Sequence, residues 1–158
     1  MKAVEEAVDF INGRREGPST YNFAVTLQGK VIGFLGSKCY PAIGYVFHPG
    51  FYRKRYAIEA LRAFIPEMWK RMPSASDQAS IPGYDYIHAY VDTENSGSVA
   101  LLEKAGFHRG VIAVNEYSSA QLGERNAFHF YLPRPGFKLE DIAGLYMQYD
   151  EPFEPDLQ

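Results

Sequence analysis

The spacing of apolar residues along the chain alternates between the two-residue period of strands and the longer period of helices. Helical spacing over residues 2–12 predicts a first helix. Strands are expected next, at residues 21–27, 31–37 and 42–47, the first two joined by a tight hairpin at 28–30. Helical spacing returns from Ala57 to Met68, and Pro66 is expected to kink this helix or to end its first part.

The second half of the chain repeats this alternation. The expected elements are a loop at 73–84, a strand at 86–91, a helix from about 96 to 105, a hairpin of strands at 111–118 and 127–132 around residues 123–126, and a short helical segment at 139–147. Asn95 is the expected N-cap of the 96–105 helix and Gly106 its stop. The strands at 42–47 and 86–91 are joined through a helix, so they should run parallel, as candidate neighbours. The element order predicts one α/β domain with a mixed sheet over residues 1–136, followed by a loosely held acidic extension at 137–158.

Composition narrows the functional classes without choosing among them. The chain has 158 residues, a formal net charge of −3 and a single cysteine, Cys39. The acidic balance argues against a nucleic-acid partner, and one cysteine excludes an intramolecular disulfide and a thiolate zinc cluster. No apolar run approaches the ~20 residues of a membrane span, and the N-terminus lacks the apolar core of a signal peptide. We therefore expect a soluble, cytoplasmic protein without a membrane partner.

A basic turn before the second helix is the first candidate site. Residues 51–56 read Phe-Tyr-Arg-Lys-Arg-Tyr, with three consecutive cations. The unpaired N–H groups and the positive dipole end of a helix attract anions, so this turn is a candidate cradle for a pyrophosphate. A solvated basic loop is the alternative interpretation of the same residues.

The most specific signal is the stretch from Asn95 to Phe107, Asn-Ser-Gly-Ser-Val-Ala-Leu-Leu-Glu-Lys-Ala-Gly-Phe. Together with Ile43-Gly-Tyr-Val-Phe-His-Pro49 upstream, it resembles the acyl-CoA-binding half of the GNAT N-acetyltransferase superfamily. Asn95, Ser98, Gly106 and Phe107 fit the pattern of its ribosomal-protein-like branch, and residues 128–136 look like the tails of fungal members. The resemblance implies a mixed, splayed sheet flanked by helices, without the family's first strand.

The resemblance also implies a binding site for acetyl-CoA. Strand backbone around Tyr45, Val46 and Phe47 would hold the pantetheine arm. The pyrophosphate would lie on the turn and helix start, formed by Arg53, Lys54, Arg55, Tyr56 and Ala57. Asn95 and Ser98 would lie near the thioester sulfur.

The implied reaction is direct transfer of the acetyl group to an amine of a small molecule or a protein N-terminus. An ammonium group must lose a proton before it attacks, and Glu116 is the candidate general base. The alternative for Glu116 is an exposed strand residue paired with a cation across the hairpin. Ser98 is the candidate acid for the leaving thiolate, because Leu102 stands where many members carry a tyrosine.

Two departures from the family pattern leave alternatives open. Arg55 replaces a glycine that lets backbone approach phosphate, so its side chain either crowds the pyrophosphate or grips it bidentately. The missing first strand opens a sheet edge. Three alternatives are open for this edge: a second subunit in a homodimer covers it, the C-terminal segment covers it, or it stays uncovered.

A function of another class remains open. A GNAT-like scaffold that no longer uses acetyl-CoA would bind a small hydrophobic ligand in an aromatic wedge, lined by Tyr45, Phe47, Tyr86 and Tyr90. His48 is a candidate neighbour of the site, whereas His88 and His129 lie on aromatic strand faces that usually pack. No histidine pair has the helical spacing of a zinc site, so no metal is expected.

Overall fold

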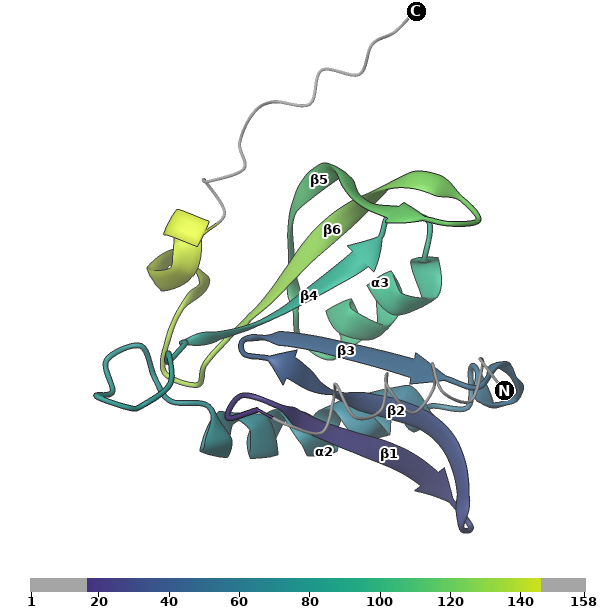
Figure 1. The fold of residues 1–158 in the computed structure, drawn as a ribbon, viewed down its shortest axis with the longest axis horizontal. Helices are drawn as coiled ribbons and strands as arrows, with labels where there is room; N and C mark the ends of the chain where they lie inside the picture. Colours follow the sequence, from purple (N-terminus) through teal and green to yellow (C-terminus); the bar gives the residue numbers. More distant parts are fainter. Residues whose placement is uncertain (1–16, 146–158) are drawn as a thin grey trace, which may run out of the picture.

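The computed structural model describes residues 17–145, which form a six-stranded mixed sheet with helices on it (Figure 1). The strand order is β1-β2-β3-β4-β6-β5. The strands are β1 (Tyr21–Leu27), β2 (Lys30–Cys39), β3 (Ala42–Phe47), β4 (Tyr86–Asp92), β5 (His108–Ser119) and β6 (Gly123–Pro133). The helices are α2 (Tyr56–Arg71), α3 (Ser96–Lys104) and the 3-10 turns η1 (Pro49–Phe51) and η2 (Leu139–Leu145). The predicted α/β class and mixed sheet are confirmed, and no strand precedes β1 within the described range.

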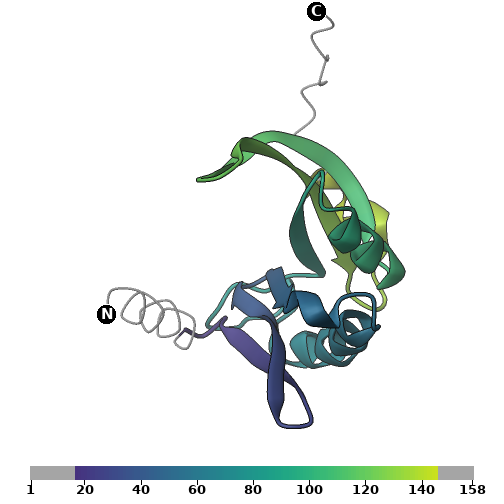
Figure 2. The ribbon, with the colours of Figure 1, turned by 90° about the vertical axis from the view of Figure 1, so that its right-hand side faces the viewer.

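Both long helices cover the same face of the sheet (Figure 2). The apolar side of α2 is buried there, with Leu61 and Met68 each 0% exposed. Leu102, also 0% exposed, anchors α3 in the same cluster. The strands contribute alternate residues to this core, in β4 Ile87, Ala89 and Val91. The residues between them, including His88 and Tyr90, therefore face the side that these helices leave open.

The sheet splays between its two parallel strands. β3 and β4 pair at a single position, Ala42 with His88, and the His88 N–H donates to the Pro41 carbonyl (3.0 Å). Beyond that position the two strands diverge toward their carboxyl ends (Figure 1). The His48 N–H bonds to Ile32 of β2 (2.8 Å), so by alternation the N–H and C=O groups of Tyr45 and Phe47 point away from β2, into the gap. The parallel neighbours expected from the sequence are thus confirmed, with free backbone groups along the splay.

Helix α2 does not stop at Pro66. It continues to Arg71 with Pro66 inside it, so the alternative of an early end is wrong. A proline inside a helix costs ~3 kcal/mol, because one N–H is lost and the ring crowds the preceding turn. Burial of Ile65, Met68 and Met72 on either side of it offsets this cost.

The second hairpin turns earlier than predicted. β6 starts at Gly123, so residues 123–126 lie in a strand and the turn is formed by residues 120–122. The Ser119 hydroxyl holds this turn by accepting from the N–H groups of Gln121 (3.4 Å) and Leu122 (3.3 Å). The pattern at 139–147 corresponds to η2 up to Leu145, whereas the helix expected at 2–12 lies outside the described residues. Across residues 17–145, the longest helices fall short of the length and apolarity that a membrane crossing requires.

Candidate active site

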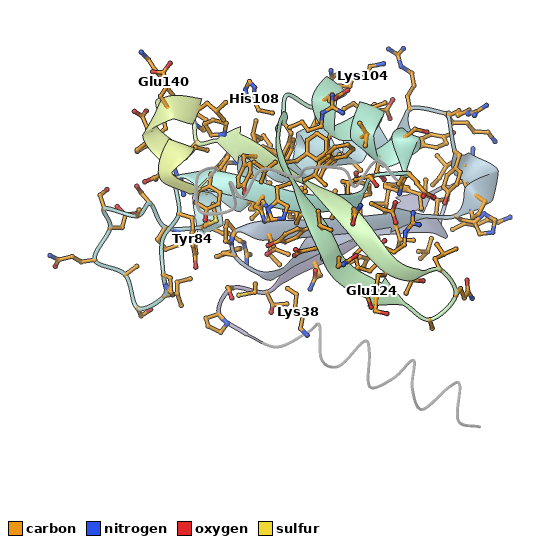
Figure 3. The ribbon with its side chains drawn as sticks, turned by 90° about the horizontal axis from the view of Figure 1, so that it is seen from above. Lys38, Tyr84, Lys104, His108, Glu124 and Glu140 are labelled. Atoms are coloured by element: carbon orange, nitrogen blue, oxygen red, sulfur yellow. The ribbon has the colours of Figure 1, made fainter. Side chains whose placement is uncertain are left out.

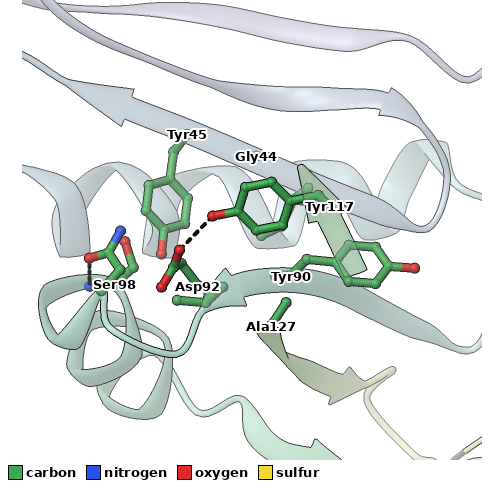
Figure 4. A pocket seen from close by; sticks show the side chains of 11 residues that line it. Gly44, Tyr45, Tyr90, Asp92, Ser98, Tyr117 and Ala127 are labelled. Carbon is green, nitrogen blue, oxygen red and sulfur yellow. Dashed lines mark hydrogen bonds between the residues drawn. The ribbon is translucent and has the colours of Figure 1, made fainter. Parts of the chain in front are cut away.

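The splay between β3 and β4 opens into a pocket of about 260 Å³ (Figure 4). Its lining comes from both faces of the sheet, because the gap lets side chains of either face reach it. The lining residues are Ile43, Gly44, Tyr45, Ala89, Tyr90, Val91, Asp92, Asn95, Ser98, Tyr117 and Ala127. Ile43, Ala89 and Val91 belong to the helix-covered core side, whereas Tyr90 and Asp92 alternate with them on the open side. The pocket therefore connects the two faces of the sheet.

The start of α3 forms one wall of this pocket. The Asn95 Oδ1 accepts from the Ser98 N–H (3.0 Å), which confirms Asn95 as the N-cap. Asn95 and Ser98 both line the pocket, so the structure brings these two predicted residues together with Tyr45. Capping does not use the Ser98 hydroxyl, which stays on the pocket side of the helix start.

The turn before α2 contains two residues in the left-handed backbone conformation, which glycine usually adopts. Arg53 and Arg55 have φ angles of 60° and 69°, and Arg55 is the N-cap of α2 without a side-chain cap. The first helical bond runs from the Glu59 N–H to the Arg55 carbonyl (3.1 Å), so the three preceding N–H groups have no partner inside the helix. A left-handed conformation costs an L-residue roughly 1–2 kcal/mol. The cationic side chains 53–55 are exposed, and the Lys54 ammonium lies 5.5 Å from the centre of the Phe51 ring.

Both helix starts lie at the same end of the splay (Figure 1). α2 begins beyond the carboxyl end of β3, and α3 begins beyond the carboxyl end of β4. Because β3 and β4 are parallel, these two ends point the same way. The predicted turn residues, from Arg53 to Ala57, are therefore at the open mouth of the gap and do not line the pocket itself.

Asp92 is the centre of a polar network at the pocket that was not predicted from the sequence. Arg125 donates two hydrogen bonds to its carboxylate (2.8 Å each), Tyr117 donates one (2.6 Å), and the Glu94 N–H donates another (2.7 Å). Arg125 also pairs with Glu94 (2.8 Å). The Arg125 guanidinium first, and then the two other donors, lower the pKa of Asp92 well below its usual range. Asp92 is thus a fixed anion in the pocket wall, already neutralised by Arg125.

A β-bulge places Glu116 and Tyr117 on the same face of the sheet. Asn115 has a φ of 52°, and the pairing of β5 with β6 shifts between Ala113 and Tyr117. The Glu116 carboxylate lies 4.0 Å from the His129 Nε2, while Tyr117 bonds to Asp92. The β5–β6 hairpin curls toward the open face, where Glu124 lies on the far side of the sheet from Lys104 of α3 (Figure 3). Glu116 is 34% exposed and does not line the pocket, so it stands on the open side beside the splay.

His88 and His129 pack together under the open face, as expected for an aromatic strand surface. His88 is 7% exposed and His129 2%, and their ring centres are 5.1 Å apart. Burial, and then the neighbouring His129, lowers the pKa of His88 to about 3. Burial also lowers the pKa of His129, which Glu116 partly offsets. Both rings are therefore neutral at neutral pH, while His48 is used locally, its Nδ1 accepting from the Gly50 N–H (3.1 Å).

The aromatic wedge expected from the sequence forms only in part. Tyr45 and Tyr90 line the pocket, but Phe47 and Tyr86 do not. The Phe47 ring lies over Gly33, where an added Cβ would clash with it. Tyr86 packs instead against Tyr84 and Tyr131 (ring centres 5.8 and 6.0 Å apart). Val46 is exposed, so of the three strand residues expected at the pantetheine only Tyr45 offers its side chain to the pocket.

Replacing Asp92 with asparagine is expected to remove a pH-dependent part of the stability. A carboxylate whose folded pKa is lowered stabilises the fold above its unfolded pKa, roughly pH 4, and this contribution is lost as the pH falls toward the folded value. Urea unfolding should therefore find the wild type more stable than Asp92→Asn above that pH, and the difference should shrink below it. A difference in the free energy of unfolding that is independent of pH between about 2 and 7 would contradict the lowered pKa of Asp92.

Comparisons with known proteins give the following similarities. A family model described as an acetyltransferase (GNAT) domain matches residues 2–108. No curated protein sequence matches. Among solved structures, the ribosomal-protein-S18-alanine N-acetyltransferase from Escherichia coli is similar, with 23% identity, a TM-score of 0.60, and coverage of 80% of this chain and 75% of that one. A variant of spermidine N-acetyltransferase from Vibrio cholerae has 16% identity, a TM-score of 0.65, and coverage of 87% and 79%. The ribosomal-protein-S5-alanine acetyltransferase from Vibrio fischeri has 16% identity, a TM-score of 0.61, and coverage of 87% and 72%.

Proposed function

Since the chain belongs to the acetyltransferase (GNAT) domain family, we propose that it transfers an acetyl group from acetyl-CoA to an amine. The observation that carries this proposal is the pocket in the splay, which joins the two faces of the sheet. A thioester placed along the helix side and an amine arriving from the open side would meet inside it. Direct transfer between two substrates requires this kind of arrangement, because no covalent enzyme intermediate carries the acetyl group.

The turn before α2 fits a pyrophosphate. Three unpaired N–H groups at the helix start and three exposed cations at residues 53–55 supply donors and positive charge. Strained backbone conformations are concentrated at functional sites. Arg53 and Arg55 are both strained in this way, because both have a positive φ angle. Arg55 keeps the glycine-like backbone while adding a guanidinium, which supports bidentate binding of phosphate over crowding.

The remaining part of acetyl-CoA would follow the gap. The free backbone groups of Tyr45 and Phe47 suit the amide groups of a pantetheine arm, which would add to β3 like a short strand. Its end would then reach the pocket wall made by Asn95 and Ser98. N–H groups at the splay would stabilise the oxyanion that forms on the thioester carbonyl.

The open face would receive the amine. Glu116 stands there beside neutral His129 and would take the proton that an ammonium group must lose. Asp92 is a poorer base, because Arg125 and Tyr117 hold it ionised. The similar proteins from Escherichia coli and Vibrio species are named for an alanine of a ribosomal protein or for spermidine, and we propose a protein N-terminus or a small-molecule amine as the acceptor of this chain. These relatives are bacterial, so the fungal likeness of residues 128–136 remains a prediction.

An acetyl-transfer assay tests this function. Purified protein would be incubated with acetyl-CoA and each of a panel of acceptors, including spermidine, simple primary amines and peptides with free N-termini. Release of coenzyme A thiol and acetylated acceptor in equal amounts is the expected result for at least one acceptor. Thiol release that no acceptor accelerates would contradict amine acetylation.

A further inference from the structure

The hydroxyl of Tyr45 is a buried donor without a use in the fold. Tyr45 lies on β3 at the splay, and its Oη is shielded from solvent and has no hydrogen-bond partner among residues 17–145. Leaving a buried polar group unsatisfied costs about 1–3 kcal/mol. Phenylalanine at this position would avoid that cost, so the presence of the hydroxyl indicates a role other than stabilising the fold.

The side chain of Tyr45 lies in the wall of the pocket between β3 and β4. Tyr45 and Ser98 line the same pocket, and in Figure 4 the phenol ring extends from β3 toward Ser98 and Asp92. Ser98 lies close enough to act on the ionisation of the phenol, although the two hydroxyls form no well-shaped hydrogen bond. The Asp92 carboxylate is already occupied by Arg125, Tyr117 and the Glu94 N–H. Within the described part of the chain, Ser98 is thus the polar side chain left beside the Tyr45 O–H, which no acceptor engages.

The ionisation state of Tyr45 suits a donor. Burial raises the pKa of its phenol, and the nearby Ser98 hydroxyl only partly offsets this rise. The group is therefore protonated at neutral pH and has a proton to give. Tyr45 lies on β3 and packs against the hydrophobic core, which also limits the directions in which the O–H can point.

We propose that Tyr45 is the catalytic acid of this site, donating its proton to the thioester sulfur as the acetyl group leaves. This inference rests on the proposed function. The amine lone pair forms the new N–C bond, the C–S bond breaks, and its electron pair goes to sulfur, which takes the Tyr45 proton. The amine nitrogen loses one proton to Glu116, and solvent returns a proton to the Tyr45 phenolate. Ser98, the acid suggested by the sequence, becomes a second donor beside the same sulfur.

The ionisation of bound coenzyme A tests this role without any acceptor. A donor aimed at the sulfur stabilises the thiolate, and a hydrogen bond to a charged group is worth about 1.5–3 kcal/mol. At a given pH the thiolate fraction of bound coenzyme A, followed by ultraviolet absorbance, should therefore be about tenfold higher in the wild type than in Tyr45→Phe. Tyr86→Phe, which changes a tyrosine outside the pocket, should match the wild type.

Two further readouts separate the possible failures. Tyr45→Phe should be no less stable than the wild type in urea, because it removes an unsatisfied hydroxyl. With an acceptor from the transfer assay, its kcat should fall about 10²-fold while its affinity for acetyl-CoA stays unchanged. Equal thiolate fractions with intact coenzyme A binding would overturn the role of Tyr45 alone. Absence of coenzyme A binding by the wild type would overturn the proposed function with it.

Discussion

Replacing Arg134 with methionine is expected to lower the free energy of unfolding by about 3–5 kcal/mol. The Arg134 side chain is 16% exposed and donates to four backbone carbonyls at the end of α2 and before β4. The shortest of these bonds, to the Met72 carbonyl, is 2.6 Å. The guanidinium also pairs with Asp85 (3.3 Å) and lies over the Trp69 ring at 4.9 Å. Methionine keeps part of the packing but removes the guanidinium from all four carbonyls and from the Asp85 carboxylate, which keeps the Ser74 hydroxyl and the Ala75 N–H as donors.

Urea unfolding followed by circular dichroism measures this loss. Arg109→Met is the matched control, because Arg109 makes a long ion pair with Glu103 (3.6 Å) in which both side chains are about half exposed. Such a pair contributes about 0–1 kcal/mol. Similar losses for the two variants would contradict the role of Arg134 in joining α2 to the β4–β6 region.

Replacing Glu116 with glutamine is expected to lower kcat about 10²- to 10³-fold, with acetyl-CoA affinity unchanged. Glutamine keeps the shape of the side chain but cannot accept the proton of the incoming ammonium group. The bulge at Asn115 holds Glu116 on the open face, so the substitution does not alter the pocket lining. Steady-state rates from the thiol-release assay, with affinities from calorimetry, separate the two effects.

Glu124→Gln provides the control for this measurement. Glu124 is an exposed carboxylate on the same hairpin, so the two variants change the net charge equally. Its kcat should stay within about threefold of the wild type, a difference below 1 kcal/mol in the barrier. A kcat of Glu116→Gln that also stays within this range would contradict the assignment of Glu116 as the base.

Most of the fold follows from local patterns in the sequence. The two-residue and helical periods predict β1 to β4 and α2, since each element places its apolar residues on the helix-covered face. The Asn95 cap and the stop at Gly106, which has a φ of 95°, delimit α3 for equally local reasons. Of the two outcomes predicted for Pro66, the early end of α2 is wrong, because tertiary burial outweighs the local penalty of the proline.

Only some residues of the candidate site could be predicted from the sequence. Asn95, Ser98 and Tyr45 line one pocket. Their places could be predicted, because each lies on or beside an element that the sequence pattern predicts. Asp92, Tyr117 and Arg125 were missed, because their contact joins residues 25 and 33 positions apart through a bulge that no local signal marks. The left-handed backbone of Arg55 was missed for a similar reason, since arginine has no preference for that conformation.

Calorimetric titration of the protein with acetyl-CoA is the decisive measurement for the proposed transferase. We expect micromolar binding by the wild type, weakened about tenfold or more by Arg55→Glu, which corresponds to about 1.4 kcal/mol. Arg62→Glu reverses the charge of another exposed arginine farther along α2 and should bind as tightly as the wild type. Equal weakening by both variants would indicate nonspecific attraction to the basic surface. Absence of binding at millimolar acetyl-CoA would contradict the acetyl-transfer function itself.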